Sequence, residues 1–420
     1  MNILMVVGKA SHSMGTFVAS LSGVLSLQNE DDISIIAEPT TAKHYRLQRV
    51  LPLWVIPTWK PHLIRSNLSR IKRARAAIAA ADVVHAHGRS AAIYVMLLTA
   101  FMPSRPPVLV SLYELADERQ DTLASKLFFR WLGTKASRLT GSSLNLAATI
   151  DAQTSTDASV SFLVSPRVEK LRANPLSNRR QRVERWAQLA QSERLKNRGQ
   201  LVLVVGSVEA EKRLDLFVKA MEKVTYPATA VVVGDGNPQL LAQLRSQGTD
   251  AQVSFLGWRK NLDVWYEAAS VLVVTSQWES LGFVAQEAMS QGLPVVAEPV
   301  GRLRDILLST RDATELARGD SVNLPPESGV GGLLVHAANV EETAAAITRL
   351  LSEPELWYEK QAEARQRSWD WPTIADISRK WLQYYRQAIA NTTKSRRVLE
   401  SQPAPHEPDL SPVNPAKVGM

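Results

Sequence analysis

The sequence contains no cysteine, which excludes disulfide bonds and thiolate metal sites. It contains no Asp-x-Asp motif and no histidine cluster of the kind that holds a catalytic metal ion. Its longest apolar run, from Ala91 to Met102, is shorter than the roughly 20 residues that a membrane-spanning helix needs. We therefore expect a protein without a resident metal and without a helical membrane anchor.

The first residues also lack the features of a targeting signal. Met1 to Gly8 is apolar, but it has no basic segment and no small-residue cleavage site. This pattern predicts a first β-strand rather than a signal peptide. Together with the absence of cysteine, it favours a cytoplasmic protein.

Acidic residues are missing from one long stretch. Between Glu38 and Asp82 there is no Asp or Glu, whereas nine lysines and arginines occur there. The whole chain carries a formal net charge of +8. A basic surface attracts nucleic acids, anionic lipids or acidic substrates, so this stretch predicts an anionic partner.

The 420 residues, of which 45% are hydrophobic, suffice for two domains with full cores. Short apolar strands alternate with helical segments in both halves, which is typical of α/β proteins with doubly wound parallel sheets. The predicted organisation is a first domain over residues 1–176, a linker with a helical insertion over 177–198, a second domain over 199–372, a last long helix over 373–391 and a disordered tail over 392–420.

The stretch from Glu279 to Pro294 carries the most informative motif. It follows an apolar strand, and its helical part is expected to begin at Phe283. Loop N–H groups and a helix N-terminus at the carboxyl end of a parallel strand bind anions. Two carboxylates, Glu279 and Glu287, flank this loop with seven residues between them. The arrangement predicts a phosphate joined to hydroxyl-rich groups, as in a nucleotide sugar.

This stretch resembles the signature of the family 4 glycosyltransferases. These enzymes have the GT-B fold, in which two Rossmann-like domains face each other across a cleft and the last helix crosses back to the first domain. The resemblance implies that Glu287 binds the nucleotide ribose and that Glu279 lies beside the transferred sugar. It also implies that the diphosphate or sugar meets the backbone N–H groups of Leu281, Gly282, Phe283 and Val284.

A second segment, from Val205 to Asp215, is also similar to this family. The resemblance places Lys212 at the diphosphate-binding position, where an ammonium group neutralises charge that develops on the leaving nucleoside diphosphate. The family often has an arginine directly after the glycine of this segment, where this chain has Ser207. We expect Ser207 to lie at the donor and hypothesise that Arg213 supplies the missing positive charge.

Four further positions resemble the family more weakly. Trp258 follows a strand that resembles the family's strand beside the nucleotide base, so the resemblance implies that Trp258 covers the base. Packing in the protein is an equally good interpretation of this tryptophan. Gly15 stands for the family's paired glycines in the loop after the first strand, and the resemblance implies that it binds the donor. His87 ends a strand that resembles a strand of the family, which implies that His87 contacts a sugar; a hydrogen-bonded structural histidine is the other interpretation. Tyr113 stands at the position where many members of the family have a histidine near the transferred sugar.

Residues 64–80 have the spacing of a basic helix. One interpretation is an ordinary amphipathic helix with a solvated basic side. The other is docking on an anionic membrane surface, with Trp54 and Trp59 as interface anchors. This second interpretation places the protein peripherally on the inner face of a membrane. No nucleic-acid-binding motif accompanies the charge, so nucleic acid is not an expected partner.

The expected function is transfer of a hexose from a UDP- or GDP-sugar to a hydroxyl group of a glycan or lipid-linked acceptor. The resemblance implies retention of anomeric configuration, no metal and no cofactor besides the nucleotide-sugar co-substrate, in cell-surface polysaccharide or glycoconjugate biosynthesis. A nucleotide-sugar epimerase is one alternative. A catalytically degenerate nucleotide-sugar-binding protein is another, which Ser207 and Tyr113 favour. Residues 8–15 lack G-x-G-x-x-G, which argues against a nicotinamide oxidoreductase.

Overall fold

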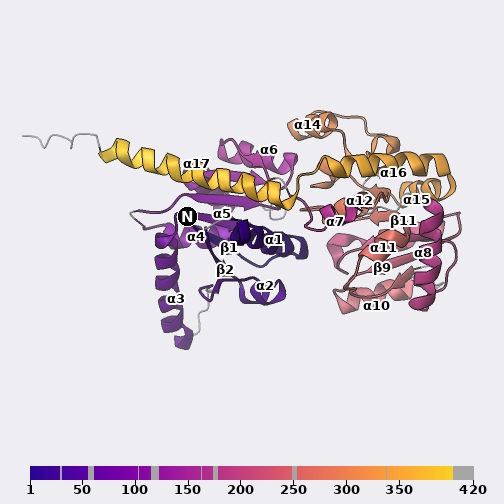
Figure 1. The fold of residues 1–420 in the computed structure, drawn as a ribbon, viewed down its shortest axis with the longest axis horizontal. Coiled ribbons are helices and arrows are strands. Elements are labelled where there is room, and N and C mark those ends of the chain that lie inside the picture. The colour runs from indigo at the N-terminus through magenta and orange to yellow at the C-terminus, as the bar shows by residue number, and fades with distance from the viewer. Residues whose placement is uncertain are drawn as a thin grey trace, which may run out of the picture.

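The chain forms two α/β domains that lie side by side (Figure 1). The computed structural model describes residues 1–28, 31–54, 61–102, 104–114, 123–161, 163–173, 178–247, 253–336 and 338–400. Each domain is built on one sheet whose paired strands are all parallel. This architecture confirms the α/β class and the doubly wound sheets predicted from the alternation of strands and helices.

The first sheet has seven strands in the order β3-β2-β1-β4-β5-β6-β7. Its strands are β1 (Asn2–Val7), β2 (Asp32–Ala37), β3 (Val50–Leu51), β4 (Val83–His87), β5 (Val108–Leu112), β6 (Arg138–Gly141) and β7 (Ser159–Val160). The central strands are buried on both faces, which explains why they are continuous apolar runs rather than alternating ones.

Helices cover both faces of this first sheet. They are α1 (His12–Gln28), α2 (Pro39–His44), α3 (Pro61–Ala80), α4 (Arg89–Thr99), α5 (Leu123–Lys135) and α6 (Leu144–Thr154). Helix α7 (Val168–Ala173) follows β7 in the sequence but packs against two helices of the second domain. One hydrophobic cluster joins α3, α4, α5 and α6 to one face of the sheet. A second cluster joins α1 to the other face.

The second sheet has six strands in the order β10-β9-β8-β11-β12-β13. Its strands are β8 (Gln200–Val205), β9 (Ala228–Val233), β10 (Val253–Phe255), β11 (Ala269–Val274), β12 (Val295–Ala297) and β13 (Gly332–Leu334). Its helices are α8 (Arg179–Ser192), α9 (Leu214–Lys223), α10 (Pro238–Gln247), α11 (Asp263–Ala268), α12 (Phe283–Ser290), α13 (Leu303–Leu307), α14 (Thr310–Arg318), α15 (Val340–Ser352) and α16 (Pro354–Trp369).

Helix α8 occupies the segment for which the sequence predicted a linker with a helical insertion. It packs on the second domain, since Trp186 and Ala190 lie in the same core cluster as β8 and β11. The buried Arg182 guanidinium donates hydrogen bonds to the carbonyls of Tyr266 (2.6 Å) and Ala269 (3.3 Å). The described part of this segment is thus structurally a helix of the second domain.

The last helix, α17 (Ile374–Glu400), crosses back from the second domain along the first (Figure 1). Trp381 and Tyr385 pack in the cluster that holds α1 on the first sheet. The helix runs past residue 392, where the sequence placed the start of a tail. Thr392 and Thr393 donate their hydroxyls to carbonyls one turn earlier, so these residues continue the helix. Residues 401–420 lie outside the described part.

Within the described ranges, no helix combines the length and the apolar character that crossing a membrane requires.

Candidate active site

The signature stretch lies where the strand order of the second sheet reverses. Strand β8 is flanked by β9 on one side and β11 on the other. Doubly wound sheets bind ligands outside the carboxyl ends of their strands at such a switch point. The Lys212 segment follows β8 and the Glu279 loop follows β11, so both predicted donor loops leave the sheet at this point.

Gly282 shapes the start of α12. Its φ of 65° lies in the left-handed region, and a Cβ here would come 2.4 Å from the Cδ1 atom of Ile306. No side chain caps the helix start. The side chains of Leu281 and Phe283 are 1% and 5% exposed and pack in the core cluster of the first domain. What the loop offers to an anion is therefore its backbone N–H groups.

Lys212 and Glu279 form an ion pair, although they lie 67 positions apart in the sequence. The same carboxylate oxygen of Glu279 accepts a hydrogen bond from the Ser276 hydroxyl at 2.7 Å. The Thr275 hydroxyl donates to the carbonyl of Lys212, also at 2.7 Å, which ties the two loops together. Both side chains of the pair are partly exposed, so a ligand has access to them.

Arg213 turns away from this pair. Its guanidinium binds the carboxylate of Glu298 at 2.5 Å and the carbonyls of Thr275 (2.8 Å) and Ser276 (3.1 Å). The hypothesis that Arg213 replaces the arginine missing at Ser207 finds no support in this arrangement. The exposed Ser207 follows the end of β8, next to the predicted diphosphate position, and brings no charge there.

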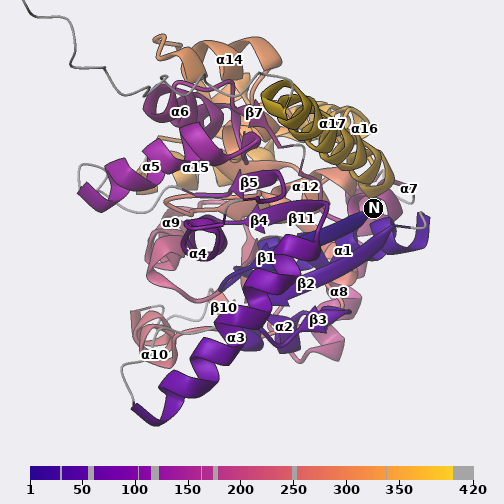
Figure 2. The ribbon, with the colours of Figure 1, turned by 90° about the vertical axis from the view of Figure 1, so that its left-hand side faces the viewer.

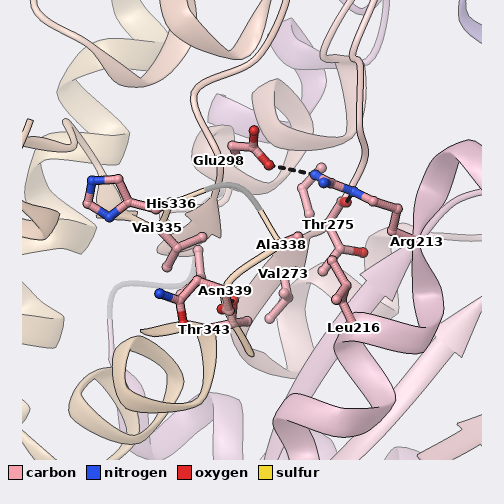
Figure 3. A pocket seen from close by; sticks show the side chains of 12 residues that line it. Arg213, Leu216, Val273, Thr275, Glu298, Val335, His336, Ala338, Asn339 and Thr343 are labelled. Carbon is pink, nitrogen blue, oxygen red and sulfur yellow. Dashed lines mark hydrogen bonds and ion pairs between the residues drawn. The ribbon is translucent and has the colours of Figure 1, made fainter. Parts of the chain in front are cut away.

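A separate pocket opens beside Arg213 (Figure 3). It lies at the carboxyl ends of β11, β12 and β13, and its polar lining includes Glu298, His336 and Asn339. In Figure 3 the Arg213 guanidinium reaches the carboxylate of Glu298 across its edge. Lys212, Glu279 and Glu287 do not line it. The pocket is therefore distinct from the cluster predicted to hold the donor.

Glu287 is buried and has partners at both carboxylate oxygens. Its Oε1 accepts a hydrogen bond from the Ser165 hydroxyl at 2.6 Å. Its Oε2 accepts from the Arg167 guanidinium at 2.7 Å and from the Tyr266 hydroxyl at 3.0 Å. Burial raises the pKa of the Glu287 carboxyl, whereas the charge of Arg167 and the two hydroxyl donors oppose the shift.

Ser165 and Arg167 belong to the segment that leaves the first domain after β7, and the sequence interpretation did not single them out. Arg167 also pairs with Asp263 of α11. The backbone N–H of Ser165 donates to the Gln286 side chain at 2.9 Å, and Gln286 donates to the carbonyl of Leu163 at 3.0 Å. The end of the first domain is thus bound to α11 and α12, and Glu287 is central to that junction.

His87 and Tyr113 meet, as their places at the ends of adjacent strands imply. The His87 Nδ1 atom and the Tyr113 hydroxyl are 2.7 Å apart, and the two residues are 0% and 4% exposed. His85 lies beside them, bound to the hydroxyls of Tyr385 (2.8 Å) and Ser111 (2.9 Å). This burial favours the structural interpretation of His87 over direct contact with a sugar.

The buried histidines predict acid sensitivity. Burial lowers the pKa of His87 from 6.5 to about 3 and that of His85 well below its ordinary value. In the unfolded chain both take up protons near pH 6.5, so stability is lost as the pH falls from 6.5 towards 3. Each neutral histidine adds about 1.4 kcal/mol per pH unit to this loss.

Urea unfolding at several pH values between 7 and 4 measures that slope. His87→Asn removes one titrating group, so the unfolding free energy of this variant should depend less steeply on pH than that of the unmodified protein. Equal slopes for the two proteins would contradict the assignment of His87 as a buried neutral base.

Two other predicted positions have different surroundings. Gly15 lies in the first turn of α1, not in a loop, and a Cβ there would come 2.2 Å from the Tyr45 ring. Its lack of a side chain thus permits close packing of Tyr45 on the helix. Trp258 is 63% exposed and follows Gly257, whose φ is 72°. An exposed indole at the carboxyl edge of the sheet is available to stack on a ligand.

Comparison with known proteins assigns the second domain to a family. The family model described as glycosyl transferases group 1 matches the stretch from 199 to 353, which contains Lys212, Glu279 and Glu287. The match covers residues 199–353, so the likeness to this family is a property of the second domain. The resemblance stated from the Glu279 and Lys212 segments is thereby confirmed.

Relatives of known name match a similar part of the chain. The D-inositol 3-phosphate glycosyltransferase of Mycolicibacterium paratuberculosis is 32% identical over 212 residues, which are 47% of this chain and 42% of that protein. Its counterpart in Mycobacterium leprae is 33% identical over 215 residues, which are 47% and 44% of the two chains. The chain thus matches less than half the length of these relatives.

Solved structures match nearly the whole chain. Anabaena Alr3699/HepE, in complex with UDP, superposes with a TM-score of 0.71 at 16% identity and covers 92% of this chain and 100% of its own. Sucrose-phosphate synthase of Thermosynechococcus elongatus superposes with a TM-score of 0.69 at 19% identity, covering 93% and 100%. These likenesses establish the GT-B fold.

Proposed function

We propose that the chain transfers a hexose from a UDP- or GDP-sugar to a hydroxyl group of a glycan or lipid-linked acceptor. The observation that carries the proposal is the Lys212–Glu279 ion pair beside the uncapped start of α12, at the switch point of the second sheet. Similar structures hold UDP or UDP-glucose, which favours the uridine donor. The proposed pathway is the synthesis of a cell-surface polysaccharide or glycoconjugate.

In this proposal the donor lies along the carboxyl edge of the second sheet. Its base stacks on Trp258, and its ribose hydroxyls donate to Glu287. Its diphosphate contacts the N–H groups at the start of α12 and the ammonium group of Lys212. When the diphosphate binds, Lys212 leaves its ion pair with Glu279 and pairs with the phosphate. Glu279 then accepts hydrogen bonds from the hexose. The first domain supplies the acceptor side.

The proposed transfer retains the anomeric configuration. The bond from the anomeric carbon to the phosphate oxygen breaks, and the acceptor hydroxyl oxygen forms the new bond on the same face. The leaving phosphate oxygen takes the proton of that hydroxyl. Positive charge at Lys212 and the helix N-terminus stabilises the diphosphate as its negative charge grows. Trapping of a covalent glycosyl–enzyme adduct would contradict this mechanism.

Two features support a second candidate, a nucleotide-sugar-binding protein without transferase activity. Ser207 brings no charge to the diphosphate, and Arg213 is bound to Glu298. Both features lower the positive charge available for stabilising a leaving diphosphate. Such a protein would bind the donor but release no nucleoside diphosphate from it.

Thermal unfolding with UDP, GDP and their hexose conjugates tests the proposal. At a ligand concentration of a hundred times its dissociation constant, mass action stabilises the protein by about 2.7 kcal/mol. We expect such a shift with a uridine or guanosine ligand, followed by release of the nucleoside diphosphate from the sugar conjugate. No shift with any of the ligands would overturn the proposal. Binding without release would support the second candidate, and release of an isomerised nucleotide sugar would indicate an epimerase.

We also propose that residues 64–80 contact an anionic membrane, which places the protein on the inner face of a membrane. On α3 the basic side chains of Arg70, Lys72 and Arg73 are exposed. Trp54 stacks on Tyr94 with ring centroids 4.6 Å apart and is half-buried, which argues against its predicted role as an anchor. Trp59, the other predicted anchor, lies outside the described residues.

A further inference from the structure

Helices α3, α4 and α5 form one side of the first domain. Figure 2 places them on the same side of the first sheet, with α17 on the other. Their inward residues, among them Ile78, Leu98 and Leu132, share one core cluster. The Arg89 guanidinium of α4 lies 5.2 Å from the ring centre of Phe128 on α5, which joins these two helices. Their outward side chains therefore belong to one surface, here called the helical surface.

Large apolar side chains are exposed on the helical surface. At α4, Leu97 is 62% exposed and Phe101, just beyond the helix end, is 88% exposed. On α5, Leu123 is 74% and Leu127 is 56% exposed. In each case the two residues are four positions apart, so they project from the same side of their segment. Single exposed apolar residues are common, but repeated pairs on adjacent helices indicate an interaction surface.

The charges of the helical surface all have one sign. Helices α3, α4 and α5 contain no Asp or Glu. Basic side chains are exposed on either side of the apolar ones: Arg70, Lys72 and Arg73 on α3, and Lys126 and Arg130 on α5. On α5 the exposed stripe therefore alternates Leu123, Lys126, Leu127 and Arg130. A protein partner would need an acidic and apolar face to match, whereas an anionic bilayer offers both properties everywhere.

We propose that the helical surface docks on an anionic lipid bilayer, with Leu97, Phe101, Leu123 and Leu127 entering the interface between headgroups and acyl chains. The basic side chains then lie at the level of the lipid phosphates. The inference extends the electrostatic contact proposed for residues 64–80 to an apolar one. Because α5 follows β5, its first turn lies at the carboxyl edge of the first sheet. A bilayer here meets the acceptor side of the molecule, where a lipid-linked hydroxyl would enter.

Co-sedimentation of the full chain with vesicles tests this inference. The vesicles contain equal parts of phosphatidylglycerol and phosphatidylcholine. Replacing all four apolar residues (Leu97→Ser, Phe101→Ser, Leu123→Ser and Leu127→Ser) should lower the partition coefficient at least about 100-fold. Leu27→Ser is the matched control: Leu27 is 88% exposed on α1, which covers the other face of the sheet, and this variant should bind like the unmodified protein.

Salt separates the two contributions. Arg70→Gln, Lys72→Gln and Arg73→Gln together should lower binding at low salt, with little further effect at 1 M salt, where charge is screened. The unmodified protein should retain measurable binding at 1 M salt, and the four-serine variant should not. Absence of vesicle binding by the unmodified protein, or equal binding by the four-serine variant, would overturn the inference. So would a change from dimer to monomer in that variant without a change in vesicle binding, because the partner would then be a second copy.

A ligand measurement keeps this inference separate from the proposed function. The thermal shift that UDP produces should be the same in the four-serine variant as in the unmodified protein, since none of the four residues lies at the proposed donor site. The shift also shows that the variant is folded. If neither UDP nor GDP nor their hexose conjugates produce a shift in either protein, the donor proposal fails, while the vesicle result stands by itself.

Discussion

Lys212→Met is expected to lower kcat for hexose transfer by about 100- to 1,000-fold, the range seen when one group that stabilises a developing oxyanion is removed. Methionine keeps the length of the side chain but removes its charge. Ser207 is uncharged and Arg213 is bound to Glu298. The positive charge where the two donor loops meet is therefore that of Lys212. KM for the donor should change less than kcat, because negative charge on the diphosphate is largest in the transition state.

Lys219→Met is the matched control for this substitution. Lys219 is an exposed lysine on α9 that pairs weakly with Asp215, so its loss should leave kcat unchanged. Steady-state rates of nucleoside diphosphate release measure both variants. Equal kcat values for Lys212→Met and the unmodified protein would show that the diphosphate leaves without help from Lys212. That result would remove the central element of the proposed mechanism.

Glu287→Gln is expected to weaken UDP binding by about 10- to 100-fold. A hydrogen bond to a charged group contributes about 1.5–3 kcal/mol, and glutamine loses the charge while keeping nearly the same shape. The variant should also unfold at a lower temperature than the unmodified protein. Arg167 loses one of its two carboxylate partners, although it keeps Asp263 and is about one-third exposed, which limits the effect.

A modified ligand distinguishes the ribose role of Glu287 from its structural role. Calorimetry with UDP and with 2′,3′-dideoxy-UDP gives a cycle in which either the carboxylate or the hydroxyls are removed. If the ribose hydroxyls bind Glu287, the dideoxy ligand binds the unmodified protein weakly, and Glu287→Gln weakens it little further. If the substitution weakens both ligands equally, Glu287 acts on the donor only by holding the domain junction together.

Glu298→Gln serves as the control carboxylate. Glu298 pairs with Arg213 at the separate pocket, so this change removes a partly buried, ion-paired negative charge without touching the proposed ribose site. It should lower stability but leave the ratio of UDP to dideoxy-UDP affinity unchanged. A changed ratio would mean that donor binding responds to any loss of charge at this edge of the sheet.

Much of the fold follows from local patterns. The apolar run from Met1 to Gly8 predicted a first strand, and β1 lies within it. The helix expected to begin at Phe283 does begin there, and Gly282 before it adopts a left-handed φ of 65° at which a Cβ would meet Ile306. The end of α17 was placed too early, because Thr392 and Thr393 are weak helix formers whose hydroxyls nevertheless bond the preceding turn.

Part of the donor site could also be predicted from local sequence patterns. Glu279 and Glu287 lie within one strand–loop–helix unit, so their spacing fixes their places around a single turn. Lys212 was found by resemblance, and the structure brings it to Glu279. Ser165 and Arg167 were missed because their contacts to Glu287 span 122 and 120 residues, and no local motif marks the segment that carries them.

By itself, the sequence determined two α/β domains, a donor loop with paired carboxylates and a basic stretch, because strand and helix periods and charge are properties of neighbouring residues. Only the tertiary structure decided that Arg167 binds Glu287, that Arg213 binds Glu298 and that His87 is buried. It also decided that Leu97 and Leu127 are left exposed on adjacent helices. These outcomes depend on which faces of distant segments pack together, and the spacing of apolar residues within a segment does not predict that packing.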